Sequence, residues 1–180
     1  MQGGDIFNAL EDDLASKQEG FISRLVFKRF ARNQIQVLTE EPTDSASELG
    51  IAVLELASGQ KQYLWLCETE ISVTESYPFD EDMIVAKATI DGKSIQLNDW
   101  NTYSMIENII ALTKKLNYEL SPDIEGKWLF GQLDLHEKLP KNCKTLRINR
   151  TICVANRFSR NRIIINNKAY GEIRFIGGEP

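Results

Sequence analysis

The sequence lacks the motifs that most directly reveal an enzyme's chemistry. It has one histidine, His136, and three cysteines, and none of these residues sits at a spacing that binds zinc. It contains neither a glycine-rich phosphate loop nor a Ser-His-Asp set. We therefore expect no metal and no other cofactor, and we expect ordinary reduced cysteines of a cytoplasmic protein.

Long apolar runs are also missing. No run approaches the roughly 20 residues that a membrane span requires. The first residues, MQGGDIFNALEDDL, are acidic and lack the basic start and apolar core of a signal peptide. The chain has 180 residues, of which 42% are hydrophobic, and this is enough for a single domain, 1–180, with a real core.

The charge is low in total and uneven along the chain. The net charge of −5 argues against a general nucleic-acid binder. Residues 138–174 nevertheless hold ten Lys and Arg and one acid, Glu172, a net charge of +9 that leaves −14 for the rest. This asymmetry suggests a directed electrostatic role, and the alternative is that basic strands pair with acidic loops inside the fold.

Residues 98–120 form the one long stretch with a clean helical period. Its apolar stripe consists of Met105, Ile109, Leu112 and Leu116. Ser104 and Glu107 have the spacing of a capping box. A shorter amphipathic helix is predicted at residues 5–17, with Ile6, Phe7, Leu10 and Leu14 on its apolar face.

The other apolar runs predict strands. Seven of them lie at residues 21–30, 33–38, 83–90, 128–135, 145–154, 158–165 and 169–176. Ser58 and Gly59 separate two further apolar runs and predict a hairpin, and Asp91-Gly92 predicts another turn. Because helices do not separate the strands, the class is α+β, with about eight strands in an antiparallel sheet around or behind one long central helix.

The order of strand, long helix and four strands over residues 72–176 resembles the hotdog fold of acyl-thioester enzymes. The likeness is carried by FGQLDLHEKLPKNCKTLRI, with a turn near Pro140, and by INNKAYGEIRFI, with Ala169 and Gly171. It makes residues 71–180 a hotdog-like core and residues 1–70 an added N-terminal helix, strands and hairpin. The resemblance implies an acyl thioester of coenzyme A or acyl carrier protein as partner, thioesterase-like or dehydratase-like processing, and a homodimer.

The same resemblance suggests catalytic acids. Thioesterases of this fold often place an acid on or near the helix, where this chain has Asp99 and Glu107. Either carboxylate could orient water or attack the thioester, and the alternative for both is helix capping. Dehydratases of the fold use a histidine in the loop before the helix. Residues 93–103 contain no histidine, which counts against a dehydratase.

A second resemblance, to chorismate lyase, runs the full length. Four segments have counterparts in that family: LEDD at residues 10–13, ASGQ at 57–60, WLF at 128–130, and a basic C-terminal stretch followed by Glu172 in the last strand. It implies that Glu172 acts on a small carboxylic acid, although Glu68 stands where the family has an arginine. The lack of a strong catalytic motif leaves a third possibility, a non-catalytic interaction module.

Alternation along the last strands nominates ligand-binding residues. Glu172 falls on one face of its strand, and Arg160 and Arg162 share a face of the strand before it. If these faces coincide, the arginines could bind an anion such as a phosphate of coenzyme A, or form a cross-strand charge ladder with Glu172. Arg150 alternates with Leu146, Ile148, Ile152 and Val154, so it should share a face of the strand with them. There it needs an anionic ligand or a position at the edge of the core.

Overall fold

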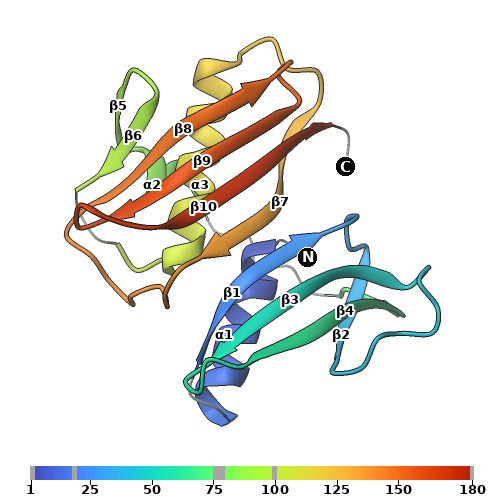
Figure 1. The fold of residues 1–180 in the computed structure, drawn as a ribbon. Coiled ribbons are helices and arrows are strands. Elements are labelled where there is room, and N and C mark those ends of the chain that lie inside the picture. Colours follow the sequence, from blue (N-terminus) through green and yellow to red (C-terminus); the bar gives the residue numbers. More distant parts are fainter. Residues whose placement is uncertain (1–2, 18–19, 75–79, 99–100, 179–180) are drawn as a thin grey trace. The chain divides into compact units, whose positions relative to one another are not determined.

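The computed structural model describes residues 3–17, 20–74, 80–98 and 101–178. The chain divides into two compact units, and each unit contains antiparallel strands and at least one helix (Figure 1). The first unit is Met1–Pro78 with Gln132–Lys138, and the second is Phe79–Gly131 with Leu139–Pro180. The predicted α+β class is therefore confirmed. Within the described part of the chain, no helix is both long enough and apolar enough to cross a membrane.

The first unit packs one helix on an antiparallel sheet. Its elements are α1 (Gly3–Lys17), β1 (Gly20–Phe27), β2 (Asn33–Leu38), β3 (Glu48–Leu56), β4 (Lys61–Ser72) and the end of β7 (Lys127–Leu135). The strand order is β2-β4-β3-β1-β7. The buried apolar residues of α1 are Ile6, Phe7, Leu10 and Leu14, as the helical spacing predicts. This helix therefore covers the sheet with the face that the sequence indicates.

The hairpin of β3 and β4 turns where the sequence predicts. Gly59 has φ +80°, a conformation that glycine adopts without the steric cost of a side chain. Its backbone N–H donates to the Leu56 carbonyl at 2.8 Å and closes the turn. The turn sets the register of the two strands, in which Leu54 lies opposite Gln62 and Ala52 opposite Leu64.

The second unit also packs a helix on an antiparallel sheet. Its elements are α2 (Glu81–Val85), β5 (Thr89–Asp91), β6 (Ser94–Leu97), α3 (Met105–Leu120), the start of β7, β8 (Leu146–Val154), β9 (Phe158–Ile165) and β10 (Lys168–Gly178). The strand order is β7-β10-β9-β8-β6-β5. Helix α3 packs on β6, β8 and β9. The described residues thus form ten strands and three helices, more than the sequence predicts.

Helix α3 begins where the predicted capping box places it. The Ser104 hydroxyl accepts a hydrogen bond from the Glu107 N–H at 3.3 Å, and the Glu107 carboxylate accepts one from the Ser104 N–H at 2.6 Å. The predicted stripe, Met105, Ile109, Leu112 and Leu116, is buried. Each such side chain stabilises the fold by about 1.5–3 kcal/mol relative to an exposed one.

A buried polar contact also ties α3 to its sheet. The Asn117 amide nitrogen donates to the Ser159 hydroxyl of β9 at 2.8 Å. Asn161, two residues further along β9, donates to the same hydroxyl at 3.0 Å. All three residues are fully buried, so the helix must stand at one position along the strand to keep these bonds.

The prediction of a strand over residues 83–90 is wrong for all but its last two residues. Most of its first half forms α2, because the Asp80 side chain caps the helix by accepting from the Met83 N–H at 3.1 Å. Only Ile84 of this helix is buried, and Met83 is 64% exposed. The strand begins at Thr89 and pairs across the predicted Asp91-Gly92 turn with β6, a strand that the sequence did not indicate.

The cap gives the first testable prediction. Ser104→Ala removes the side-chain acceptor for the Glu107 N–H, so the free energy of unfolding should fall by about 1 kcal/mol. Chemical denaturation followed by circular dichroism measures this change. The matched control is Thr102→Ala, an exposed position just before the helix, which should alter the free energy by less than about 0.5 kcal/mol. Equal effects of the two substitutions would show that the cap contributes nothing.

Candidate functional site

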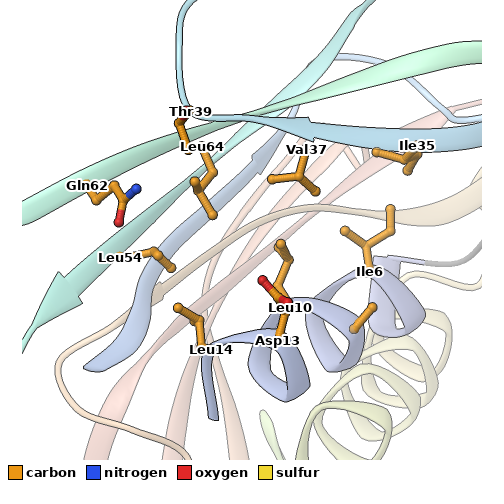
Figure 2. A pocket seen from close by; sticks show the side chains of 11 residues that line it. Ile6, Leu10, Asp13, Leu14, Ile35, Val37, Thr39, Leu54, Gln62 and Leu64 are labelled. Carbon is orange, nitrogen blue, oxygen red and sulfur yellow. The ribbon is translucent and has the colours of Figure 1, made fainter. Parts of the chain in front are cut away.

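A pocket lies between α1 and the sheet of the first unit (Figure 2). Its volume is about 440 Å³, within the range of small-molecule sites in proteins. The larger apolar residues that line it are Ile6, Leu10, Leu14, Ile35, Val37, Leu54 and Leu64. Its polar lining comes from Asp13, Thr39 and Gln62. The pocket is therefore an apolar chamber with a few polar groups, the composition typical of ligand sites.

Helix α1 supplies one wall of the pocket. Ile6, Leu10 and Leu14 follow one another at intervals of four residues, so they lie on one face of the helix and are buried. Asp13 is exposed and lines the pocket beside them. Among the described residues of the lining, it is the one acid.

Strands β2, β3 and β4 supply the opposite wall. Ile35 and Val37 alternate along β2 and both face the pocket (Figure 2). Val37 pairs in register with Leu66 of β4. Val37 is 43% exposed, so the β2 side of the pocket is the more open one, whereas Leu64 on β4 is buried.

Glu68 holds β2 beside β4. Its carboxylate accepts hydrogen bonds from the backbone N–H groups of Arg32 and Asn33, the latter at 2.8 Å, and from the Arg29 guanidinium. The hydrogen bond from the Arg32 N–H, then that from Asn33, and to a lesser degree Arg29 lower the pKa of Glu68 from its usual 4.5 to about 2. Glu68 is therefore ionised at neutral pH and fixes the chain where β2 begins.

The two acids predicted near α3 have different outcomes. The Glu107 carboxylate is engaged in the capping box described above, which is the structural alternative that the sequence left open. Its role as a catalytic acid stays a prediction. Asp99 lies outside the described residues.

The basic residues and Glu172 do gather on one face. Glu172 of β10 lies opposite Arg162 of β9, and its carboxylate is 3.8 Å from Nε of Arg160. Arg174 lies opposite Arg160 in the same ladder. Their neighbours Ser159 and Asn161 point the other way and are buried, so the charged residues occupy the face of the sheet away from α3. Such a ladder between partly exposed side chains contributes only tenths of a kcal/mol per pair.

Arg150 faces the helix side of the sheet, with Ile148. Its guanidinium donates to the Ser121 hydroxyl at 2.8 Å and to the Leu120 carbonyl at 3.1 Å. It thereby satisfies acceptors at the C-terminus of α3, where a cation is favourable. The prediction that Ile152 shares its face is wrong, because a bulge between Arg150 and Ile152 shifts the register and leaves Ile152 partly exposed.

The pocket residues were not among the predicted site residues. Two signals in the sequence pointed to them. Ile35 and Val37 alternate with polar residues on β2, and Asp13 directly precedes Leu14 of the α1 stripe. Neither signal reveals a cavity, because the cavity depends on which strands pair. Among the described residues, no group of three or more His, Cys, Asp and Glu is placed to hold a metal.

Comparison with known proteins gives fold neighbours only. No protein-family model matches the chain. No curated protein matches it either. Among solved structures it is similar to the pyran synthase domain from module nine of the sorangicin pathway, with TM-score 0.50, 9% identity and coverage of 98% of this chain and 86% of that one.

Two further neighbours were found at lower TM-scores. The erythromycin dehydratase has TM-score 0.46 and 12% identity, and the comparison covers 99% of this chain and 81% of that one. A thioesterase II from Thermobifida fusca YX has TM-score 0.46 and 10% identity, with coverage of 99% and 87%. The neighbours are hotdog-fold proteins, and the chain has a hotdog-like fold, as the sequence resemblance implied.

The Glu68 carboxylate gives a pH-dependent prediction. Because its pKa is about 2 in the folded protein and near 4.5 when unfolded, its stabilising effect is present above pH 4.5 and is lost as the pH falls towards 2. The difference in unfolding free energy between wild type and Glu68→Gln should therefore shrink over this window. Denaturant titrations at several pH values measure it. Glu70→Gln, an exposed position on the same strand, is the control and should give a much smaller change.

Proposed function

We propose that this protein binds the acyl group of an acyl thioester in the α1 pocket and hydrolyses the thioester. The observation that carries the proposal is the apolar chamber of about 440 Å³ with one carboxylate, that of Asp13, in its described lining. The hotdog-like fold supports it at the level of architecture. Coenzyme A or an acyl carrier protein would carry the acyl group, and a homodimer remains part of the prediction.

The lining favours an acyl chain over a polar ligand. Leu10, Leu54 and Leu64 present only hydrocarbon, and an aliphatic chain gains about 0.8 kcal/mol for each methylene group that it buries. A charged or heavily hydroxylated ligand would lose its water there without gaining hydrogen bonds. The polar groups of Asp13 and Gln62 suit the thioester end of the ligand.

Asp13 supplies the chemistry in this proposal. Its carboxylate takes a proton from a water molecule, and the water oxygen attacks the thioester carbonyl carbon. The carbon–sulfur bond then breaks, the carboxylic acid is released, and the thiolate takes up the proton. The reaction needs no cofactor.

The other candidate activities have less support. A dehydratase of this fold uses a histidine, whereas His136 is exposed just past the end of β7 and is not among the described lining residues. A chorismate-lyase-like reaction would use Glu172, but its carboxylate faces Arg160 in the outer charge ladder. A non-catalytic module that binds an acyl group is the second candidate, favoured by the exposure of Asp13 to solvent.

The acyl pocket predicts a dependence on chain length. The affinity for acyl-coenzyme A should rise by roughly fourfold for each methylene until the pocket is full, and then level off. Val37→Trp places a large ring at the open side of the pocket and should weaken decanoyl-coenzyme A binding by about tenfold or more. Isothermal titration calorimetry measures both effects.

Tyr63→Trp is the matched control for this substitution. Tyr63 is 51% exposed on the neighbouring hairpin and does not belong to the described lining. Its replacement should leave the affinity unchanged within about twofold. An affinity that is the same for acetyl- and decanoyl-coenzyme A would rule out an acyl pocket.

A substitution of Asp13 distinguishes an effect on catalysis from an effect on binding. Asp13→Asn should lower the rate of thiol release from the best acyl-coenzyme A by about 100-fold or more, while its dissociation constant stays within a few-fold. Thiol release is measured with a chromogenic disulfide. The neighbouring Asp12→Asn is the control, since Asp12 is exposed on α1 and outside the described lining. Binding without turnover in the wild type would leave only the non-catalytic candidate.

A further inference from the structure

A second, smaller pocket lies on the second unit, over strands β5, β6 and β8. Its volume is about 280 Å³. It is lined by Thr89, Asp91, Ser94, Gln96, Asn98 and Arg147. Every one of these side chains is polar or charged, so the pocket differs in chemistry from the apolar chamber of the first unit. Nothing in the proposed thioesterase activity uses it.

The strand register brings these residues together from distant parts of the sequence. Thr89 lies opposite Gln96, and Gln96 lies opposite Arg147, so the three form one row across the strands. Asp91 and Ser94 form the adjacent row. Neighbouring strands are about 4.8 Å apart and each residue advances a strand by about 3.4 Å, so Asp91, two strands and one row (two residues) from Arg147, lies roughly 12 Å from it across the sheet. The pocket therefore carries a negative group at one end and a positive group at the other.

Arg147 is the charged residue with the clearest need of a partner. Its side chain is half-buried, and its Nε is buried with no hydrogen-bond acceptor among the described residues. None of the described carboxylates forms an ion pair with it. A buried donor without an acceptor costs free energy, and an oxygen of a bound anion would remove this cost.

The uncharged residues add donors beside Arg147. The Gln96 amide nitrogen donates to the Asn98 side-chain oxygen at 2.6 Å, which leaves the Asn98 amide nitrogen as a donor for a ligand. The hydroxyls of Thr89 and Ser94 can donate as well. Hydroxyl and guanidinium donors from three strands, with the amide donor of Asn98 just past the end of β6, suit a group with several acceptor oxygens.

The surrounding face is electropositive. Arg160, Arg162 and Arg174 lie on the same face of the sheet as Arg147, and Glu172 is the one acid in their part of the ladder. A patch of one sign raises the local concentration of ligands of the opposite sign. An anion would therefore be attracted to this face and held at Arg147.

We propose that this pocket binds a small hydroxylated phosphomonoester, of the class of polyol and sugar phosphates. The phosphate accepts hydrogen bonds from Arg147, Thr89 and Asn98, since its three terminal oxygens take more donors than a carboxylate. The hydroxyl groups of the ligand donate to the Asp91 carboxylate at the other end. The site takes no part in the thioester chemistry and does not depend on it.

The test uses glycerol 3-phosphate, inorganic phosphate and glycerate with the full chain. Titrations followed by the side-chain amide signals of Gln96 and Asn98 in NMR spectra should show saturable binding of glycerol 3-phosphate at millimolar concentrations or below. Glycerate should bind more weakly. Arg147→Gln should weaken the binding of glycerol 3-phosphate by about tenfold or more. Asp91→Asn should weaken the binding of glycerol 3-phosphate but not that of inorganic phosphate.

Arg162→Gln is the matched control. Arg162 lies on the same face but outside the described lining, so its replacement should change the affinity by less than about threefold. Thr89→Val, at an exposed position, gives a second variant should Arg147→Gln unfold, and it should weaken binding several-fold. Equal affinity of wild type and Arg147→Gln, tighter binding of glycerate, or no saturation by glycerol 3-phosphate would each overturn the proposal.

Discussion

The ionised carboxylate of Glu68 is the constraint on which the first unit's pocket depends. It accepts hydrogen bonds from two backbone N–H groups at the point where β2 begins, and so it fixes β2 against β4. A register irregularity lies at this point, between Asn33 and Ile35. A slip of one residue would turn Ile35 and Val37 to the opposite face of the sheet. This partly exposed carboxylate therefore helps to set which side chains form a wall of the first unit's pocket.

The second unit uses polar contacts in the same way. Burial of the α3 stripe supplies stability, but apolar contact alone tolerates sliding of a helix along a sheet. Asn117, bonded to Ser159, and Arg150, bonded to the last turn of α3, each require one position of the helix. These bonds are weak in net free energy, yet breaking one leaves a buried polar group without a partner. They therefore specify the arrangement that the apolar contacts stabilise.

Local sequence patterns predicted most of the fold because local forces decide it. The capping box at Ser104 and the glycine turn at Gly59 each act within a few residues. The strand prediction for residues 83–90 was wrong over its first half because Asp80, just before the apolar run, caps a short helix there. The pocket could not be predicted, since Ile35 meets its wall partners only through pairing with β4, some 30 residues later. A bulge likewise ended the alternation after Arg150.

The uneven charge of the chain becomes intelligible once the strands are paired. Residues 138–174 carry ten of the chain's 21 Lys and Arg and only one acid, but alternation along the strands divides the arginines between two faces. Arg150 turns towards α3 and finds carbonyl and hydroxyl acceptors, whereas Arg147 and Arg162 turn outwards. Arg150, which binds the end of α3, therefore adds no charge to the outer face of the sheet. The outward arginines lie on the neighbouring strands β8 and β9. A net charge read from the sequence therefore describes a surface only after the register has assigned each side chain to a face.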